Sequence, residues 1–501
     1  MTTEVMRPGG GPTTSEEGLR TLVVGAGQAG KALARDLQRV PDFGLAPIGF
    51  LDDDPSKTQV RHLPVLGTLS DLLRVCTEHR VDVVVLAIPG LPEAQVQRLA
   101  TAAARVGASV RRLPSFVRLL QRDVVGTDMR SLDVATLIGR REVHVASPEV
   151  VGIIRDRVVL VTGAGGSIGS ELCRQVNGFG PARLIMLDHD ESNLHRLQLE
   201  LHGEAFLDSH DVVVADIRDA GRMHQVMQEY RPQVVFHAAA LKHLPMLEEH
   251  PCEGVKSNVE GTDNVLRAAV DCDVERFVAI STDKAADPTS VLGATKALAE
   301  LVVKAHTGGR TVVSAVRFGN VLGSRGSLLP VLVSQMASGR EVTVTHPDVT
   351  RYFMTIEEAV GLVLEAAHLT TGGETFVLDM GAPVRIVDLV ASFARQLEVP
   401  DVGIRFTGLR PGEKLHESLF SESEQCFPTS HPRIFAALPA RPTGDFERHL
   451  HWLYEAASRN AADEVRRRMV AALPDFRPDG DAAVRAPATV PSAWAPYPDD
   501  Y

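Results

Sequence analysis

One short stretch near the middle of the chain, residues 281–296 (STDKAADPTSVLGATK), concentrates side chains that could transfer protons. Thr282 supplies a hydroxyl, Asp283 a carboxylate, and Lys284 and Lys296 supply ammonium groups. An acid and a base held beside a substrate typically accelerate a reaction by about 10²–10⁴-fold each. A solvated turn with a surface ion pair is the alternative interpretation of these residues.

The residues on either side of this stretch predict where its side chains lie. An apolar run at 276–280 predicts a buried strand. Asp287-Pro288 predicts the start of the next helix, because Asp is a good N-cap and Pro at the first helical position loses no N–H that the helix needs. The hydroxyl, the carboxylate and the first ammonium would then lie on a loop at the carboxyl end of a strand, where open parallel sheets bind ligands.

A glycine-rich turn earlier in the chain predicts a dinucleotide site. The turn follows an apolar strand at 157–162 and has the pattern GxxGxxG, formed by Gly163, Gly166 and Gly169. The missing side chains let the backbone approach a pyrophosphate, whose charge meets the N-terminus of the next helix. A tight turn without a ligand is the alternative.

Asp188 indicates which dinucleotide this turn would bind. It ends the next strand, 19 residues after Gly169, where a carboxylate can accept both ribose hydroxyls and would repel a 2′-phosphate. The sequence therefore predicts NAD rather than NADP. We expect the Asp216-Ile217 pair to flank the adenine. The other residues expected at this cofactor site are Ser167, Ile168, Ala238 and Ala239.

A second glycine pattern lies near the N-terminus. An apolar strand at 22–24 leads into GxGxxG at 25–30, and an acidic cluster follows at 52–54. These features suit a nucleotide, yet residues 31–150 contain no set of catalytic side chains. A bound nucleotide and a scaffold that retains the turn both remain open.

The alternation of apolar strands with helical patterns predicts an α/β protein with two Rossmann-like, doubly wound parallel-sheet domains. The second domain would end in a smaller substrate-binding lobe beyond about residue 325. Residues 445–473 have the pattern of a charged surface helix. The predicted segments are a disordered leader at 1–18, the first domain at 19–150, the second at 151–440, a helical segment at 441–473 and a disordered tail at 474–501.

Composition excludes several classes of function. A net charge of −12 over 501 residues argues against general nucleic-acid binding, although a few converging Arg and Lys could still hold an anionic ligand. The five cysteines form no CxxC pair, and no carboxylate–histidine spacing indicates a metal site, so we expect no metal and a reducing cytoplasm. No apolar run approaches the roughly 18–20 residues that span a bilayer.

Between residues 163 and 420 the chain carries a series of longer motifs. In order, they are GAGGSIGSEL, DIRD, HAAALKHLPMLE, NVEGTDNV, STDKAADPTSVLGATK, RFGNVLGSRGS, THPDVTRYFMT and GLRPGEKLHESLF. Together they strongly resemble the CapD-like polysaccharide-biosynthesis branch of the extended short-chain dehydrogenase/reductase superfamily, over roughly residues 155–440. The first domain, CoA-binding-like, also resembles the long members of that branch. Those members usually carry several transmembrane helices before it, whereas this sequence has no apolar run of that length. A cytoplasmic protein is therefore expected, with membrane association left open.

This resemblance implies an NAD-dependent 4,6-dehydratase acting on a UDP-N-acetylhexosamine, with UDP-GlcNAc as the expected substrate. Oxidation at sugar C4 acidifies the C5 proton, the C6 hydroxyl leaves, and reduction at C6 gives a 4-keto-6-deoxy sugar. The resemblance assigns the C4 hydroxyl to Thr282, protonation of the leaving hydroxyl to Asp283, removal of the C5 proton to Lys284 and the nicotinamide ribose to Lys296. Lys284 can act as a base only if burial or a cation, Lys242 or Lys296, lowers its pKa.

Leu292 departs from the pattern of most short-chain dehydrogenases, which have Tyr-x-x-x-Lys where this chain has Leu292-Gly-Ala-Thr-Lys296. Leucine cannot take the hydroxyl proton as hydride leaves, so that proton must go elsewhere. In the long branch of the family an apolar residue, often Met, stands here in active enzymes, and Thr282 with Asp283 could serve as a relay. A degraded site is the alternative.

The family's motifs also assign residues to the nucleotide sugar, and Arg suits a pyrophosphate because its planar fork bonds two oxygens at once. We expect a UDP-sugar substrate and a homo-oligomer. A nucleotide-sugar 4-epimerase and a non-catalytic nucleotide-sugar-binding regulatory protein are the alternatives. The residues expected to contact the substrate are Lys242, Asn320, Arg325, Arg351, Arg410 and Glu413.

Overall fold

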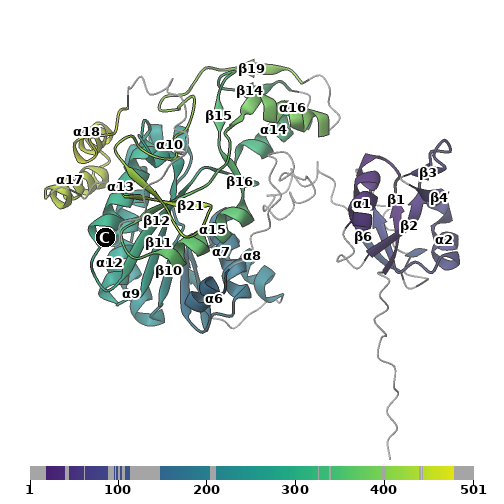
Figure 1. Ribbon diagram of the computed structural model, residues 1–501, viewed down its shortest axis with the longest axis horizontal. Helices are drawn as coiled ribbons and strands as arrows, with labels where there is room; N and C mark the ends of the chain where they lie inside the picture. The colour runs from purple at the N-terminus through teal and green to yellow at the C-terminus, as the bar shows by residue number, and fades with distance from the viewer. Residues whose placement is uncertain are drawn as a thin grey trace, which may run out of the picture. The chain divides into compact units, whose positions relative to one another are not determined.

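The computed structural model divides the chain into two units, residues 1–123 and 124–501 (Figure 1). Ser147 already belongs to the second unit, because its backbone N–H and hydroxyl both bond the carboxylate of Glu365. The second unit therefore includes residues that the sequence placed in the first domain. The structure describes residues 19–39, 45–60, 62–88, 95, 98–99, 102–103, 106, 108–112, 147–203, 210–324, 326–337, 340–396, 402–438, 442 and 444–478.

The first unit is a sheet with the strand order β3-β4-β2-β1-β5-β6. The central strand β1 pairs in parallel with β2 and β5, and only β3 runs antiparallel to its neighbour β4. Helix α1 begins at Gln28, within the GxGxxG pattern at 25–30. The elements are β1 (Leu19–Val24), α1 (Gln28–Arg39), β2 (Leu45–Leu51), β3 (Gln59–Val60), β4 (Leu63–Gly67), α2 (Leu72–Glu78), β5 (Val83–Leu86) and β6 (Ser109–Arg112).

The second unit has a nine-stranded sheet with the order β20-β21-β17-β12-β11-β10-β7-β8-β9. From β9 to β17 all neighbours pair in parallel, and the strand order reverses at β7, as in a doubly wound sheet. The predicted fold class is confirmed. The strands are β7 (Val158–Thr162), β8 (Arg183–Asp188), β9 (Val212–Val214), β10 (Val234–His237), β11 (Arg276–Thr282), β12 (Val312–Phe318), β17 (Thr375–Leu378) and the antiparallel pair β20 (Gln425–Pro428) and β21 (Ile434–Leu438).

Helices cover both faces of this sheet because its strands are apolar on both sides. Leu160 of β7 packs into one apolar cluster, whereas Val159 and Val161 pack into the other. Residues of α9, α12 and α13 belong to the first cluster, and residues of α6, α7, α8 and α15 to the second. The helices are α6 (Pro148–Ile154), α7 (Ser167–Gly178), α8 (Glu191–His202), α9 (Ala220–Tyr230), α10 (Leu244–Glu249), α11 (Pro251–Gly254), α12 (Gly261–Asp271), α13 (Val291–Ala305) and α15 (Ile356–Leu369).

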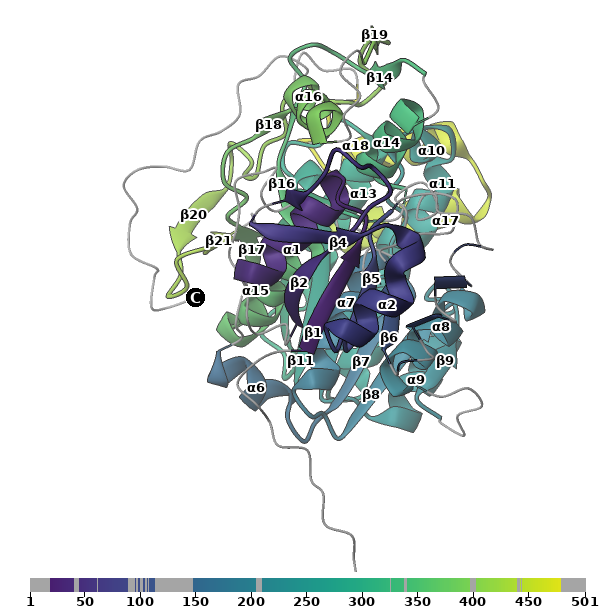
Figure 2. The ribbon, with the colours of Figure 1, turned by 90° about the vertical axis from the view of Figure 1, so that its right-hand side faces the viewer.

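A smaller lobe follows β12, as the shorter elements of the sequence predict. It contains three two-stranded sheets, β13-β16, β14-β19 and β15-β18, with α14 and α16 packed beside β14 (Figures 1 and 2). The elements are β13 (Asn320–Leu322), α14 (Leu328–Ala337), β14 (Val342–Val344), β15 (Thr350–Arg351), β16 (Phe353–Thr355), β18 (Val384–Arg385), α16 (Ile386–Gln396) and β19 (Ile404–Phe406). None of the helices in the described ranges combines the length and apolar character that crossing a bilayer requires.

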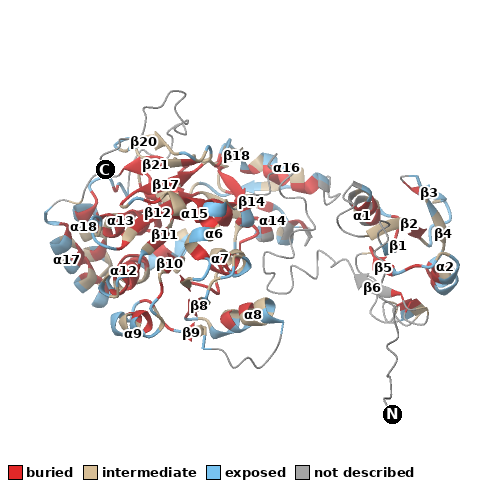
Figure 3. Ribbon diagram, turned by 60° about the horizontal axis from the view of Figure 1, so that its bottom comes forward, coloured by how far each residue is buried: buried red, intermediate tan, exposed pale blue. Residues whose placement is uncertain are grey.

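The prediction of one charged surface helix at 445–473 is wrong. The segment forms two helices, α17 (Phe446–Ser458) and α18 (Ala462–Ala472), and each has buried and exposed residues along it (Figure 3). Leu453 and Met469 are fully buried and belong to the same apolar cluster as α12 and α13. Apolar residues recur at helical spacing along α17, which places them on one side of the helix. The charged residues occupy the other side, and they dominate the composition of the segment.

Leu453→Ala should lower the free energy of unfolding of the second unit by about 2–5 kcal/mol, because it leaves a cavity in a fully buried position. Glu455→Ala, an exposed position of the same helix, is the control and should change stability by less than about 0.5 kcal/mol. Urea unfolding followed by circular dichroism measures both. Equal stability of the two variants would mean that α17 does not contribute to the core.

Candidate active site

The residues that could transfer protons lie at the carboxyl end of β11. Thr282 is the last residue of this strand, and Asp283–Ala285 forms one 3₁₀ turn directly after it. The strand thus extends two residues beyond the predicted end, and Thr282 lies on the strand rather than on the loop. The Thr282 hydroxyl donates to Asp283 Oδ1 at 3.0 Å and accepts from the Lys284 backbone N–H at 3.5 Å.

The predicted helix start at Asp287-Pro288 is wrong. Helix α13 begins at Val291, and Ser290 is its N-cap. Asp287 instead has a φ of 43° and donates its backbone N–H to the hydroxyl of Ser421. Bonds to a distant segment of the chain therefore override the local capping signal.

Lys284 is the centre of a buried polar cluster. Its Nζ lies 2.9 Å from Asp283 Oδ1, 3.3 Å from Asn320 Oδ1 and 3.4 Å from Glu417 Oε1. The side chains of Asp283 and Glu417 are 0% and 3% exposed, whereas that of Lys284 keeps 19%. An ammonium has three N–H donors, so the three acceptors together hold Lys284 in its charged form.

The pKa of Lys284 is raised, not lowered as its proposed role as a base requires. Burial disfavours the ammonium, but the attraction of Asp283 and Glu417 outweighs both burial and the repulsion from Arg351. The expected cations Lys242 and Lys296 are not the charges that determine this pKa. Tertiary structure places a second carboxylate where the sequence suggested a cation.

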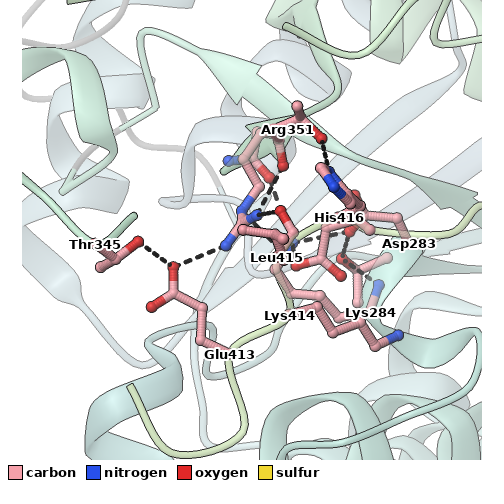
Figure 4. A network of polar contacts seen from close by, with 12 residues as sticks. Asp283, Lys284, Thr345, Arg351, Glu413, Lys414, Leu415 and His416 are labelled. Atoms are coloured by element: carbon pink, nitrogen blue, oxygen red, sulfur yellow. Dashed lines mark hydrogen bonds and ion pairs between the residues drawn. The ribbon is translucent and has the colours of Figure 1, made fainter. Parts of the chain in front are cut away.

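Arg351 and Glu413, both expected at the substrate, bind each other. Arg351 Nη2 lies 2.8 Å from Glu413 Oε1, and Thr345 donates to the same oxygen at 3.1 Å (Figure 4). Arg351 Nε lies 3.8 Å from Glu417 Oε1, and its Nη1 donates to the Thr350 carbonyl. The guanidinium of Arg351 therefore lies next to both Glu413 and Glu417 and holds their carboxylates in position.

The other residues predicted to contact the substrate lie in different places. Arg410 is exposed, and its backbone N–H donates to Glu413 Oε2. Lys242 is exposed at the start of the segment that leads into α10, and Asn320 contacts Lys284. Arg325 lies outside the described residues.

Sequence reasoning missed Glu417 and Lys414, although both lie in the motif GLRPGEKLHESLF. Lys414 is buried, donates to the Ala286 carbonyl at 2.7 Å and has a pKa lowered by burial. The signal was present, because Glu413, Lys414 and Glu417 are three ionisable residues within five positions of a family motif. Nothing local shows which of them faces the turn after β11.

A pocket of about 410 Å³ lies at the carboxyl ends of β7, β8 and β10. Gly165 at its floor donates its backbone N–H to Asp188 Oδ2 at 2.9 Å. Asp188 is buried, and Asp216 at the next strand is held by a bidentate pair with Arg218. The predicted cofactor residues that line the pocket are Gly163, Gly166, Asp188, Asp216, Ile217, Ala238 and Ala239.

The glycine-rich turn fits a dinucleotide because its backbone is closely packed and bare. A Cβ on Gly163, whose φ is 67°, would lie 2.6 Å from the Ala239 backbone nitrogen, and one on Gly169 would lie 2.0 Å from the Gly163 carbonyl oxygen. Ser167, Ile168 and Gly169 form the first turn of α7, directly behind the pocket. Backbone N–H groups at a helix N-terminus suit a pyrophosphate.

Lys296 and His237 are two buried titratable residues that do not line this pocket. Lys296 is buried and donates to the Ile280 carbonyl at 2.6 Å, and burial lowers its pKa to about 8 against the attraction of Glu300. His237 bonds Thr162 and Thr262, and burial together with Lys296 lowers its pKa to about 3. His237 is thus a neutral hydrogen-bonding residue. Within the described ranges, no three His, Cys, Asp or Glu side chains are grouped to hold a metal.

Leu292 is 5% exposed and packs in the apolar cluster of α12 and α13. The side chain at this position therefore contributes to the core. In the first unit, a carboxylate also binds the backbone of the glycine-rich turn. Asp52 accepts from the Ala26 N–H at 2.7 Å and lies 3.2 Å from Lys57. Because Asp188 makes the same kind of bond, this geometry does not distinguish a nucleotide site from a scaffold.

Comparisons with known proteins place the chain among polysaccharide-biosynthesis proteins. Residues 159–439 match the family described as polysaccharide biosynthesis protein, and residues 12–114 match a family described as CoA-binding domain. The probable polysaccharide biosynthesis protein EpsC of Bacillus subtilis is 42% identical over 82% of this chain and 71% of its own length. The capsular polysaccharide biosynthesis protein CapD of Staphylococcus aureus is 41% identical over 81% and 69%.

Part of the chain is also similar to a sugar-nucleotide epimerase and to a solved bacterial structure. The UDP-glucose 4-epimerase of Rickettsia rickettsii is 34% identical over 54% of this chain and 79% of its own length. The crystal structure of Pen from Bacillus thuringiensis shares 33% identity and a TM-score of 0.53, and covers 57% of this chain and 90% of its own. The predicted resemblance to the CapD-like branch is confirmed.

Asp188→Ala should weaken NAD binding at least about tenfold, because the ribose hydroxyls lose their carboxylate acceptor. Binding of NADP should weaken less, since the repulsion of its 2′-phosphate is lost at the same time. Titration calorimetry with each dinucleotide measures the two affinities. Glu191→Gln, an exposed position just beyond the pocket, is the control, and unchanged NAD affinity in Asp188→Ala would contradict the assignment.

Proposed function

The chain belongs to the polysaccharide biosynthesis protein family of extended short-chain dehydrogenases/reductases, and on that premise we propose that it is an NAD-dependent 4,6-dehydratase of a UDP-N-acetylhexosamine, UDP-GlcNAc being the expected substrate. The observation that carries the proposal is the hydrogen-bonded unit of Thr282, Asp283 and Lys284 at the carboxyl end of β11. An enzyme that exchanges a hydride only at C4 has no use for an acid and a base directed at C5 and C6.

The pocket at β7, β8 and β10 would hold the cofactor. Gly163 and Gly166 would face the pyrophosphate, Asp188 the adenosine ribose and Ala238 and Ala239 the nicotinamide side. Lys296 of α13, whose ammonium donates to the carbonyl of Ile280 on β11, would bind the nicotinamide ribose. When bound, NAD supplies the acceptor for the C4 hydride and the donor for reduction at C6.

Thr282 and Asp283 would act first, at the C4 hydroxyl. Thr282 already donates to Asp283 Oδ1, so a proton leaving the sugar hydroxyl can pass through the threonine hydroxyl to the aspartate. Asp283 then carries the proton that the C6 hydroxyl needs to leave as water. This route replaces the tyrosine that Leu292 does not supply.

Lys284 would act at C5. Its side chain is the partly exposed member of the buried cluster, so it can face a substrate seated above the strand ends. Asn320 holds its ammonium from the smaller lobe at 3.3 Å. The exposed Arg410 would bind the pyrophosphate of the nucleotide sugar, the role that the family's motifs also give to Arg325, and Arg351 would hold Glu413 through their ion pair.

The reaction can be followed by proton NMR of the purified protein with UDP-GlcNAc and NAD in D₂O. We expect a new C6 methyl signal with deuterium incorporated, which only dehydration produces. The UDP-glucose 4-epimerase relatives favour epimerisation as the second candidate, which would give UDP-GalNAc without a methyl signal. Bound but unchanged substrate would instead support a regulatory protein.

Lys284→Ala should reduce turnover at least about 10²-fold, because the C5 proton loses its proposed acceptor. Its content of bound NAD should equal that of the unmodified protein, since Lys284 does not line the cofactor pocket. Turnover is measured by the NMR assay and cofactor content by chromatography after denaturation. Arg310→Ala, on the exposed surface, is the control, and loss of NAD from Lys284→Ala would contradict the assigned role.

A further inference from the structure

Two carboxylates beside Lys284, those of Asp283 and Glu417, each have one oxygen near the ammonium and one buried oxygen without a hydrogen-bond donor among the described residues. Asp283 Oδ1 and Glu417 Oε1 both contact the Lys284 ammonium. Their other oxygens, Asp283 Oδ2 and Glu417 Oε2, are buried and have no hydrogen-bond partner among the described residues. A buried carboxylate oxygen without a donor is costly, and it can accept a proton without breaking an existing bond.

The proposed reaction takes two protons from the substrate before it returns one as water. The first comes from the C4 hydroxyl and the second from C5. Asp283 can take the first, but Lys284 begins as an ammonium and cannot take the second unless it gives up a proton of its own. A second acceptor is therefore needed beside Lys284.

Other groups near the turn do not meet this need. Leu292 has no titratable group. Tyr352 is buried, and its pKa is raised by burial and by the charge of Asp283, so its phenol stays protonated. Lys414 carries a positive charge opposite the same carboxylates and donates to the Ala286 carbonyl.

We propose that Glu417 is a positioning residue that receives a proton from Lys284 while Lys284 takes the proton from C5. This inference rests on the proposed dehydration. The Nζ of Lys284 lies 3.4 Å from Glu417 Oε1, so contact between the two is already made. Glu417 acts through Lys284 and does not itself touch the substrate.

The steps balance. Oxidation at C4 breaks its O–H and C–H bonds, sends the proton through Thr282 to Asp283 and the hydride to NAD. Lys284 then passes one proton to Glu417 and forms a new N–H bond with the C5 proton, while Asp283 protonates the departing C6 hydroxyl and a C5–C6 double bond forms. Hydride returns to C6, Lys284 returns its proton to C5, and Glu417 returns its proton to Lys284. Each side chain ends as it began.

The charges around Glu417 support both directions of this transfer. Burial acts to raise the pKa of Glu417, but Lys284, Arg351 and Lys414 outweigh it and hold the pKa below its ordinary value. Glu417 is thus an anion before the reaction. Once Asp283 is protonated, one negative charge facing the Lys284 ammonium is lost, which makes the transfer from Lys284 to Glu417 easier.

Glu417→Gln tests the proposal because glutamine keeps the shape of glutamate but cannot take the proton. At neutral pH we expect oxidation at C4 to persist, seen as reduced nicotinamide in a single turnover, and exchange of the C5 proton with D₂O to fall at least about 10²-fold. Glu417→Asp should restore part of the exchange. Loss of both steps together would overturn the proposal, since it would mean a general failure of the site.

The pH dependence separates a proton acceptor from a structural residue. Without the Glu417 carboxylate, the Lys284 ammonium loses one of the two negative charges that oppose burial and Arg351, so the pKa of Lys284 should fall. Neutral Lys284 can then take the C5 proton by itself, and C5 exchange in Glu417→Gln should recover as pH rises, whereas the unmodified protein should not gain over that range. Glu422→Gln, at an exposed position of the same segment, is the control for C5 exchange. Glu413→Gln is the matched variant for the pKa of Lys284, because Glu413 also binds Arg351 but does not contact Lys284.

The pKa of Lys284 can be measured without any turnover, by NMR titration of lysine side chains labelled with ¹³C, since the chain has only eight lysines. A lower Lys284 pKa in Glu417→Gln and an unchanged one in Glu413→Gln are expected. If the unmodified protein dehydrates the substrate but C5 exchange in Glu417→Gln does not change with pH, the proposed role of Glu417 is overturned and the proposed function is not. Absence of dehydration by the unmodified protein would overturn the proposed function, and the titration would still show whether Glu417 controls Lys284.

Discussion

The attraction between Lys284 and the two carboxylates beside it is the interaction on which the site depends. Removing an ion from water costs several kcal/mol, and this cost is recovered only when the ions are paired and hydrogen-bonded in good geometry. The buried cluster meets this condition because each of its ions lies next to a charge of opposite sign. Its anions are Asp283 and Glu417, and its cations are Lys284, Arg351 and Lys414. The cluster therefore forms only when β11 and the segment carrying Glu417 are both in place.

The segment from 412 to 424 is held against the turn by bonds along its length. Thr289 donates to the Gly412 carbonyl, Lys414 to the Ala286 carbonyl, and the Asp287 N–H to Ser421. At its end, Glu424 pairs with the fully buried Arg317 of β12. These bonds explain why Asp287 adopts a positive φ and why α13 begins only at Val291. The same bonds that delay the helix fix Glu417 at Lys284.

The cofactor side of the sheet is organised differently, by close backbone packing rather than by buried charge. Gly163 approaches the backbone of Ala239, and the Gly165 N–H fixes Asp188 in position. This pocket is formed by consecutive strand ends around β7, so its residues follow from local strand and turn patterns. The proton-transferring cluster instead joins the end of β11 to the smaller lobe and to the segment that follows it.

The amino-acid sequence was enough to predict the alternating fold of the second unit, the glycine-rich turn with Asp188, and the position of Thr282–Lys284 at a strand end. Each of these follows from the spacing of apolar residues and glycines within a short window. Tertiary structure decided the start of α13, the burial of α17 and α18, and the pairing of Lys284 with Glu417. Charges far apart in sequence meet only after the chain folds, and their attraction outweighs burial, so no local pattern could indicate that the pKa of Lys284 is raised. What the sequence presented as a threonine, an acid and a base is, in the folded protein, a lysine held between two carboxylates.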